Sequence, residues 1–355
     1  MDKYFESGEL KPFGTVSASY MGVPLMLSGA IVGVMVVHDY HIEDAYSATD
    51  EELMVFASDH IARAIESVRA EEMIQKQHLL VLEHRQAITD SIRYATRIQK
   101  AVLPSSAYLE HVLPDHFILF RPKDVISGDF YWVQDLGRFK VAIVSDCTGH
   151  GVPGAMMSML GITLLNEHFR TFGVGEPDAI LGHLKDKVKE ILAQEGSEDD
   201  QKDGMDMAIV LINQERHELH FAGANRPLFL FRKKEEGEIS NLVPSFENDD
   251  YELFIFKGDR QPIGAHWEEK AFTRHSVKLQ EGDSLYMFTD GFVDQYGGEN
   301  RKKFKIQQFR ELLLSIQTEP MERQKLLIEE AFEKWCGNNE QIDDVCVLGL
   351  RVHFA

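Results

Sequence analysis

Residues 69–103 contain neither glycine nor proline, and this tract divides the chain into three regions. It is rich in charge, and apolar side chains recur in it every seven residues: Ile74, Val81, Ile88, Ala95 and Val102. Such a column is one half of a coiled-coil seam. The other half is mostly polar: His78, Arg85, Ile92 and Gln99. The tract therefore predicts one long linker helix with a weak seam, ending before Pro104, because proline cannot continue a helix.

The region before this helix, residues 1–68, reads as part of an α/β domain. Residues 30–37 are rich in β-branched side chains and predict a buried strand. Asp50 is predicted to open a helix, with carboxylates in its first turn, where the helix dipole favours them. This order resembles the C-terminal half of a GAF sensor domain. We expect only a part of that domain, a leftover or dimerising fragment without an intact ligand pocket.

Beyond the linker, short apolar strands alternate with turns, and the predicted helices are grouped at about 153–170, 177–194 and 304–334. Strands that cluster apart from helices indicate an α+β fold with layered sheets and argue against a βαβ repeat. The predicted organisation is therefore a partial GAF-like segment at 1–68, a helical linker at 69–104 and one larger domain at 105–355.

Composition narrows the class of protein. The chain has 355 residues, 44% of them hydrophobic, and a formal net charge of −21. A general nucleic-acid binder needs a basic face, and an acidic surface also disfavours anionic membranes, so we expect neither partner. The apolar run near residues 23–37 is too broken to span a membrane, and no secretory signal pattern opens the chain. Three cysteines fit a reducing compartment, and we expect a cytoplasmic location.

The candidate chemistry lies in aspartates that flank apolar strands. Asp129 stands in a Ser-Gly-Asp turn, Asp146 and Asp290 each follow an apolar strand, and Asp343 and Asp344 open the last strand. Strands that end in this way can bring their carboxylates together at the rim of a sheet. Clustered carboxylates repel one another, and a shared cation stabilises them. Ligand sets made only of oxygen select hard ions such as Mg²⁺ and Mn²⁺.

The segments around these aspartates resemble one family. They read SGDFYW, DCTGHGVPGAMMSMLG, GDSLYMFTDGFVDQ and QIDDVCVLG, with FAGANRPL and DRQPIG between them. Their order and spacing resemble those of SpoIIE-type phosphatases, a group of protein phosphatase 2C-like (PPM) enzymes, over roughly residues 90–353. The resemblance implies an α-β-β-α sandwich of two packed antiparallel sheets. It also implies hydrolysis of phosphoserine and phosphothreonine by metal-activated water.

The resemblance also assigns roles to the aspartates. Asp146 would bridge two Mn²⁺ or Mg²⁺ ions, and the backbone carbonyl of Cys147 would bind one of them. Asp290 matches the second carboxylate ligand. The final ligand matches Asp343, with Asp344 at the neighbouring position that is often not a ligand. By the same resemblance Asp129 acts through metal-bound water, as a ligand and a catalytic residue.

Further residues are candidates for supporting roles. His150 is a candidate general acid or water-orienting group, and a helix-capping or supporting histidine is the alternative. Asp206 is a candidate for a third, accessory metal, or else a solvated loop carboxylate. Lys123 or Arg121 could hold phosphate.

The expected partners follow from the same resemblance. SpoIIE-type enzymes commonly act on small phosphoproteins, such as antagonists of anti-sigma factors, in partner-switching signalling. We also expect a homodimer through the linker helix, with Ile98 docking on the phosphatase domain. Two alternatives stay open: a pseudophosphatase that only binds a phosphoprotein, and a hydrolase of a small phosphorylated metabolite. The absence of a Walker-type phosphate loop weakens the second.

Overall fold

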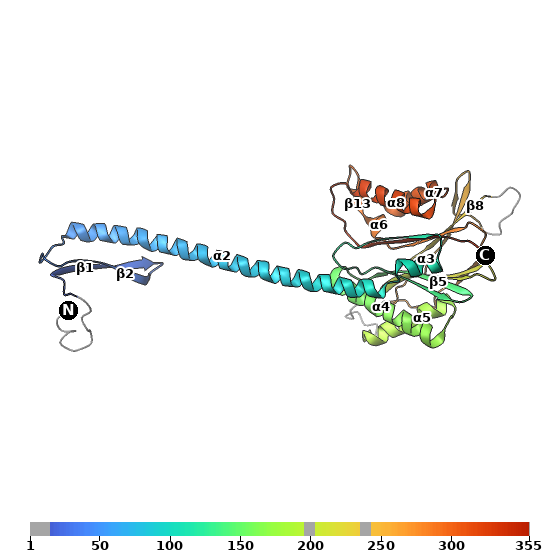
Figure 1. Cartoon of the computed structure of the whole chain (residues 1–355), viewed down its shortest axis with the longest axis horizontal. Helices are drawn as coiled ribbons and strands as arrows, with labels where there is room; N and C mark the ends of the chain where they lie inside the picture. Colours follow the sequence, from blue (N-terminus) through green and yellow to red (C-terminus); the bar gives the residue numbers. More distant parts are fainter. Residues whose placement is uncertain (1–14, 195–202, 235–242, 355) are drawn as a thin grey trace. The chain divides into compact units, whose positions relative to one another are not determined.

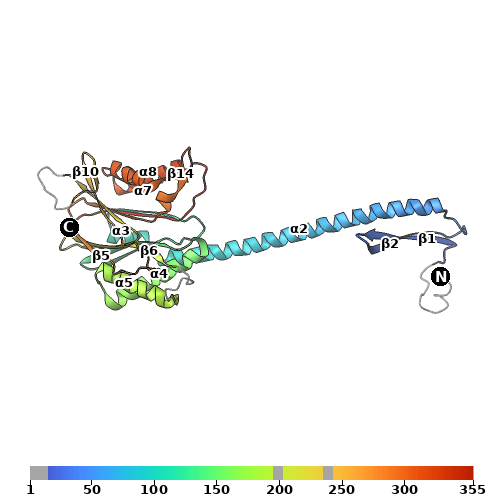
Figure 2. The same cartoon turned by 180° about the vertical axis from the view of Figure 1, so that it is seen from behind.

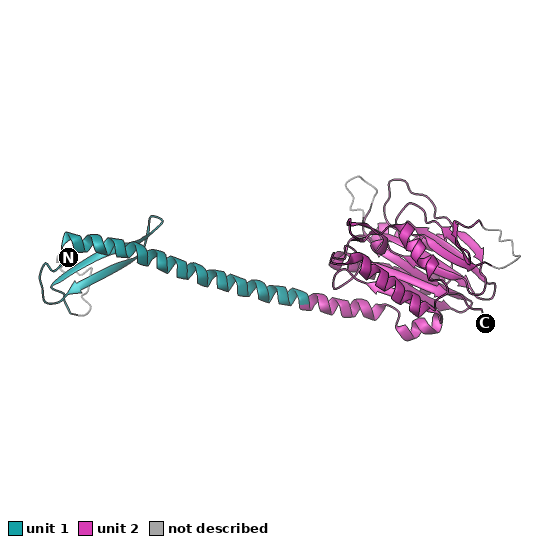
Figure 3. Ribbon diagram, turned by 90° about the horizontal axis from the view of Figure 1, so that it is seen from above, with its two compact units in different colours: residues 1–89 teal, residues 90–355 magenta. Residues whose placement is uncertain are grey.

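The computed structural model describes residues 15–194, 203–234 and 243–354. It divides into two compact units, Met1–Thr89 and Asp90–Ala355 (Figure 3). The first unit contains a hairpin of β1 (Ser19–Leu27) and β2 (Ala30–Asp39), paired antiparallel. Both turn residues, Ser28 and Gly29, have positive φ, which is the conformation that a two-residue hairpin connection requires.

The expectation that residues 30–37 are buried is wrong. They form β2, but Ile31, Val34 and Val36 are 67%, 61% and 43% exposed, whereas Val23 and Leu25 of β1 are buried. The composition of a strand predicts its backbone, but its burial depends on what covers it. A two-stranded hairpin has two faces, and the described part of this unit has a single helix to cover them.

The helix α2 runs without a break from Ala48 to Val102, so it joins the end of the first region to the predicted linker. It begins two residues before the predicted position. Ser47 and Asp50 bond reciprocally: the Ser47 amide donates to Asp50 Oδ2 at 2.8 Å, and the Asp50 amide donates to Ser47 Oγ at 3.3 Å. This capping pair places Asp50 inside the first turn. The helix ends before Pro104, as predicted.

The second unit contains two sheets in which every described pair of neighbouring strands is antiparallel (Figures 1 and 2). One has the order β3-β15-β12-β8-β10-β9 and the other β11-β7-β6-β5-β4. Their bounds are β3 His116–Arg121, β4 Phe130–Leu136, β5 Phe139–Cys147, β6 Met205–Asn213, β7 Glu218–Ala224, β8 Leu228–Lys233, β9 Phe246–Glu247, β10 Tyr251–Phe256, β11 His275–Lys278, β12 Ser284–Phe288 and β15 Val345–Arg351. The predicted sandwich of two antiparallel sheets is confirmed.

Helices cover both outer faces of this sandwich. Helices α4 (Gly151–Phe172) and α5 (Pro177–Ile191) lie on the five-stranded sheet, and α7 (Lys305–Ser315) and α8 (Met321–Cys336) lie on the six-stranded sheet (Figure 1). The smaller elements are α3 (Ser106–Val112), α6 (Gly291–Asp294), β13 (Tyr296–Gly297) and β14 (Lys302–Lys303). Among the described residues, no helix is both long and apolar enough to cross a membrane.

Alternation along each strand builds three apolar layers. On β5, Ala142 and Val144 face the core between the sheets, whereas Val141 and Ile143 pack against the layer of α4 and α5. A third cluster lies between the six-stranded sheet and the helices α7 and α8. Strands buried on both faces read as continuous apolar runs. Their polar ends are therefore free to carry the functional side chains.

Candidate metal centre

The predicted aspartates gather at one end of the sandwich. Asp146 lies near the end of β5, and Asp206 lies directly opposite it in register on the neighbouring strand β6. From the other sheet, Asp290 follows β12, and Asp343 and Asp344 precede β15. The antiparallel pairing of β12 with β15 brings these last groups to the same end. The sheet rim that the sequence predicts is therefore built from both sheets.

Arg226 joins the two sheets at this rim. Its Nη2 atom donates to Oδ2 of Asp146 at 2.7 Å, of Asp290 at 2.8 Å and of Asp206 at 3.1 Å. The arginine side chain is only 12% exposed. Burial alone would lower its pKa, but the neighbouring carboxylates, Asp146 first, raise the pKa above its ordinary value. One guanidinium thus carries the positive charge for three aspartates.

Asp129 is one of the two most deeply buried carboxylates of the group; like Asp344, it is only 2% exposed. Thr289, the residue before Asp290, donates its hydroxyl to Asp129 Oδ2 at 2.7 Å. Burial first, and then the charge of Asp146, raise the pKa of Asp129 well above its usual range. The threonine bond fixes the carboxylate beside the cluster.

Three further carboxylates of the cluster also have raised pKa values. Burial first, and then the charges of Asp290 and Asp206, raise the pKa of Asp146 to about 8, although Arg226 opposes the shift. Burial likewise raises the pKa of Asp206 and of Asp343. Carboxyl groups that resist ionisation when crowded in this way have a strong need for a cation.

Asp343 and Asp344 differ in their environment. Both oxygens of the buried Asp344 accept backbone N–H groups, Oδ1 from Lys123 and Oδ2 from Gly128, each at 2.7 Å. Asp343 is half-buried and accepts the Asp344 amide at 2.9 Å. Asp344 therefore positions the loop that carries Asp129, and Asp343 is the one of the pair with an oxygen available to a ligand.

His150 forms a hydrogen-bonded chain with Asp124 and Lys123, which lie in the loop that carries Asp129. Its Nδ1 lies 2.8 Å from Asp124 Oδ2, and its Nε2 lies 3.0 Å from Lys123 Nζ. An ammonium can only donate, so Nε2 is an acceptor and Nδ1 carries the proton. This chain is exposed at the surface of the unit. His150 occupies the N-cap position of α4, but its side chain makes no capping hydrogen bond to the helix.

Arg121 is directed elsewhere. Its Nη1 donates to Glu333 at 3.1 Å, and its guanidinium lies 5.4 Å from the centroid of the Phe332 ring on α8. Of the two predicted phosphate-binding residues, only Lys123 therefore lies in the loop that Asp344 ties to the carboxylate cluster.

Asp206 corrects one interpretation. It is a member of strand β6, not a solvated loop carboxylate, and Asn225 Nδ2 donates to its Oδ1 at 2.7 Å.

Cys147 is buried in the apolar layer beneath α4, and burial raises the pKa of its thiol well above the usual range. Its side chain therefore has a packing role.

Glycines allow the loops around the cluster to pack backbone against backbone. A Cβ on Gly154 would lie 2.2 Å from the Gly149 carbonyl oxygen, and one on Gly291 would lie 1.8 Å from the Asp344 carbonyl oxygen. Gly149 itself has a φ of 84°, which favours glycine. The glycine after Asp290 is therefore required by the close approach of two backbone segments.

Three residues of the cluster were not predicted from the sequence: Arg226, Asn225 and Thr289. A signal for the first two was available, since both lie in the FAGANRPL segment, where polar residues and a proline follow an apolar strand. No such signal distinguishes Thr289 from any other residue at a strand end. Its role depends on the pairing of β12 with its neighbours in space.

The chemistry of the donor set, though not its arrangement around Arg226, fits hard divalent cations. The set consists of carboxylate oxygens from both sheets, and it already binds one cationic group, the guanidinium of Arg226. Within the described residues, no three His, Cys, Asp or Glu side chains stand in an arrangement that could hold a metal ion. Arg226 is bonded to three of the carboxylates that such an arrangement would use.

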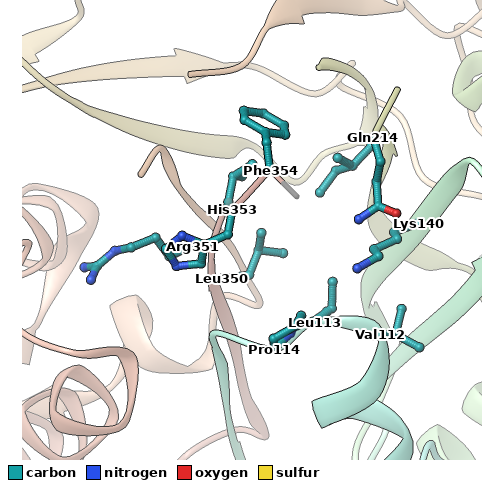
Figure 4. Close-up of a pocket in the computed structure, with 11 residues that line it drawn as sticks. Val112, Leu113, Pro114, Lys140, Gln214, Leu350, Arg351, His353 and Phe354 are labelled. Carbon is teal, nitrogen blue, oxygen red and sulfur yellow. The ribbon is translucent and has the colours of Figure 1, made fainter. Parts of the chain in front are cut away.

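A separate apolar cavity of about 260 Å³ lies away from this cluster (Figure 4). Lys140 of β5 lines it together with the last residues of the described chain, among them Val352 and Phe354. Lys140 and Asp146 lie six residues apart on β5, which is about 20 Å along a strand. The cavity therefore belongs to the other end of the sandwich.

Comparison with known proteins gives two family matches. A family model described as stage II sporulation protein E (SpoIIE) matches residues 138–353, and a GAF-domain model matches residues 3–65. The second match agrees with the predicted GAF-like segment. A comparison with curated protein sequences found no match.

Solved structures give the same picture. The SiaA-PP2C domain of Pseudomonas aeruginosa is 32% identical, with a TM-score of 0.64, over 76% of this chain and 98% of that one. The PP2C phosphatase domain of the cell fate determinant SpoIIE from Bacillus subtilis, with a fragment of its regulatory domain, is 20% identical. Its TM-score is 0.52, over 68% of this chain and 63% of that one. The second likeness concerns the fold alone.

Proposed function

The chain belongs to the SpoIIE family of PP2C-like phosphatases, and from this premise we propose that it hydrolyses phosphoserine and phosphothreonine on a regulatory phosphoprotein with the help of two Mn²⁺ or Mg²⁺ ions. Phosphatases of this group generally depend on these ions. The observation that carries the proposal is the convergence of aspartates from both sheets around a single cationic group.

The aspartates would divide the work. Asp146, Asp290 and Asp343 would be ligands of the two ions, and the Cys147 carbonyl would be a further ligand. Asp206 would be a ligand of a third ion. Bound there, the ions would activate a water molecule for in-line attack on phosphorus and neutralise the charge on the phosphoryl oxygens. Asp129, fixed by Thr289, would orient water at the cluster.

The exposed chain of Asp124, His150 and Lys123 would receive the substrate. The Lys123 ammonium is a mobile positive charge suited to a phosphoryl oxygen. With Nε2 accepting a hydrogen bond, His150 would orient water or accept a proton, and donation of a proton would require Lys123 to move away first. Asp344 would hold this loop in place through the Lys123 amide.

A covalent phosphoenzyme is not part of the proposal. Cys147, the thiol nearest the cluster in sequence, is buried, and its raised pKa disfavours the reactive thiolate. Water is the nucleophile that an all-carboxylate site can supply. Trapping of a phosphorylated intermediate on this chain by acid quench would contradict the mechanism.

The proposal is tested by assaying one preparation on three substrates: a phosphoserine peptide, a nucleotide and a small phosphorylated sugar. We expect release of phosphate from the peptide in the presence of Mn²⁺ and none after EDTA. Full activity in metal-free buffer would overturn the metal site. Preference for the small substrates would favour a metabolite hydrolase, and binding of the phosphopeptide without turnover would favour a pseudophosphatase.

The physiological substrate would be a small phosphoprotein, such as an antagonist of an anti-sigma factor. The support for this is the family, not a feature of the described surface. The phosphoproteins that accumulate when the protein is removed from the cell identify the substrate. Accumulation of phosphorylated metabolites alone would contradict it.

A further inference from the structure

Resting on the metal site proposed above, we propose that Arg226 is a built-in cation that holds the carboxylate cluster together before metal binds, and that the metal must displace it. Arg226 is then a positioning residue that sets the metal affinity of the enzyme. The sequence motif alone gave it no role.

The contacts of Arg226 resemble the coordination of a cation more than a paired salt bridge. A guanidinium usually meets one carboxylate with two parallel bonds. Here a single nitrogen, Nη2, meets Oδ2 of three different aspartates at 2.7, 2.8 and 3.1 Å. Two of those aspartates belong to neighbouring strands of one sheet, and the third follows β12 of the other sheet.

The fit is incomplete, which favours displacement. Nη2 carries two hydrogens, so three acceptors cannot each receive a straight bond. Nε of the same guanidinium is buried without a hydrogen-bond partner. A buried donor left unsatisfied costs about 1–3 kcal/mol. The arginine therefore neutralises the cluster without satisfying its own donors, and a divalent ion with matching oxygen ligands would do better.

The backbone beneath Arg226 is fixed, so the exchange involves its side chain. The turn between β7 and β8 crosses from one sheet to the other, with Asn225 at a φ of 59°. The Asn225 amide donates to Asp259 O at 2.7 Å, and the Asp259 amide donates back to Gly223 O at 2.8 Å. A Cβ on Gly223 would lie 2.2 Å from the Arg226 carbonyl oxygen. Withdrawal of the guanidinium is therefore a rotation about side-chain bonds.

Metal and guanidinium exclude each other because both need the same oxygen atoms. Two positive groups at one site also repel each other. A ligand that must displace an internal group binds more weakly by the free energy of that group's contacts. The observed metal affinity of the wild-type protein is therefore lower than the carboxylate set alone would give.

The test is Arg226→Met, which keeps an unbranched apolar stem and removes the charge. Titration calorimetry with MnCl₂ measures affinity, and thermal unfolding measures stability with and without the ion. We expect the Kd for Mn²⁺ to fall about tenfold, and the metal-free Tm to fall because three carboxylates lose their cation. A purely structural role would weaken metal binding and stability together. An unchanged or raised Kd overturns the proposal.

Two further variants keep the result interpretable. Arg232→Met removes another buried arginine, which pairs with Asp283 at 2.6 Å, and should lower the Tm without tightening Mn²⁺ binding. Arg226→Gln, neutral but still a donor, should also bind Mn²⁺ more tightly. If Arg226→Met folds only with Mn²⁺, the ion has replaced the arginine, as proposed. If it folds in neither state, Arg226→Gln decides by the same criterion. Failure of the wild-type protein to bind Mn²⁺ at all would instead overturn the metal site itself.

Discussion

At the scale of single residues, Asp146 and Asp290 carry most of the proposed chemistry, because each supplies a charge from a different sheet. We expect Asp146→Asn and Asp290→Asn each to lower phosphatase turnover by about 10²-fold or more, the scale of losing one charge-stabilising group at a reacting centre. Their circular dichroism should remain that of the wild-type protein, since the amide has the same shape. Near wild-type turnover of either variant at saturating Mn²⁺ would remove that residue from the site.

Gly291 lies so close to the backbone of Asp344 that no side chain fits there. A Cβ there would meet the Asp344 carbonyl oxygen, which belongs to the backbone and cannot move aside. We expect Gly291→Ala to lower the free energy of unfolding by about 3 kcal/mol, the upper end of overpacking costs. Denaturant unfolding measures this change.

Gly182 provides the matched control for that substitution. It lies in α5, and a Cβ there would meet nothing within 4 Å. Gly182→Ala should therefore raise the free energy of unfolding by about 0.5–1 kcal/mol, because alanine stabilises a helix relative to glycine. Equal effects of the two alanines would show that the contact with Asp344 is not what matters.

At the scale of elements, the end of α2 is tied to the loop that carries Asp129. Gln99 is buried, and its side-chain amide makes two hydrogen bonds to the backbone of Ser127. Its Nε2 donates to the Ser127 carbonyl oxygen at 2.6 Å, and its Oε1 accepts from the Ser127 N–H at 3.2 Å. Nε2 also donates to Ser158 Oγ on α4 at 2.9 Å. This residue was assigned to the polar half of the coiled-coil seam, and its burial in the second unit contradicts that assignment.

We expect Gln99→Leu to lower the free energy of unfolding by about 1–3 kcal/mol, because the Ser127 backbone groups lose their partner. The Kd for Mn²⁺ should rise as well, since the loop positions Asp129. Calorimetry and thermal unfolding measure the two effects. Lys100→Ala, at the exposed neighbouring position, is the control and should change neither. Loss of stability with an unchanged Kd would mean that the hydrogen bonds of Gln99 do not affect metal binding.

The elements of this chain were predictable to the extent that local pattern decides them. The apolar runs before Asp146 and Asp290 predicted the strands β5 and β12, and Pro104 predicted the end of α2. These predictions were possible because backbone preference and proline geometry act within a few residues. The burial of β2 was not predictable, since it depends on what packs against the strand. The same limit applies to Gln99, whose partners are 28 and 59 residues away.

The residues of the candidate site likewise divide into those that the local sequence predicts and those that depend on the fold. Its acidic members could be identified because each stands at or near the end of an apolar strand in the sequence. The register that places Asp206 opposite Asp146, and the turn that places Arg226 among three carboxylates, are properties of sheet pairing. A sequence shows which groups need a cation, and only the fold shows that one is built in.

At the scale of the whole molecule, the linker helix is the element through which we propose that two copies pair. Within the described residues, the seam positions Ile74, Val81 and Ile88 are 65%, 63% and 61% exposed. Ala95 and Ile98 instead line an apolar groove with Met156 of α4. Ile98 is still 47% exposed, so the expected docking of this residue is at most partial. Substitutions at Ala95 would disturb the groove as well as the seam.

The pairing is therefore tested farther up the helix, with Val81→Glu and Ile88→Glu combined. Two charges placed in a seam that is already half polar should convert dimers to monomers, as measured by light scattering after gel filtration. The Mn²⁺ concentration needed for half-maximal activity should change with it, if pairing tunes the metal site. Leu82→Glu, one position past the seam and 46% exposed, is the matched control and should stay dimeric. A double variant that remains dimeric, or becomes monomeric with the same metal dependence, would reduce the helix to a tether.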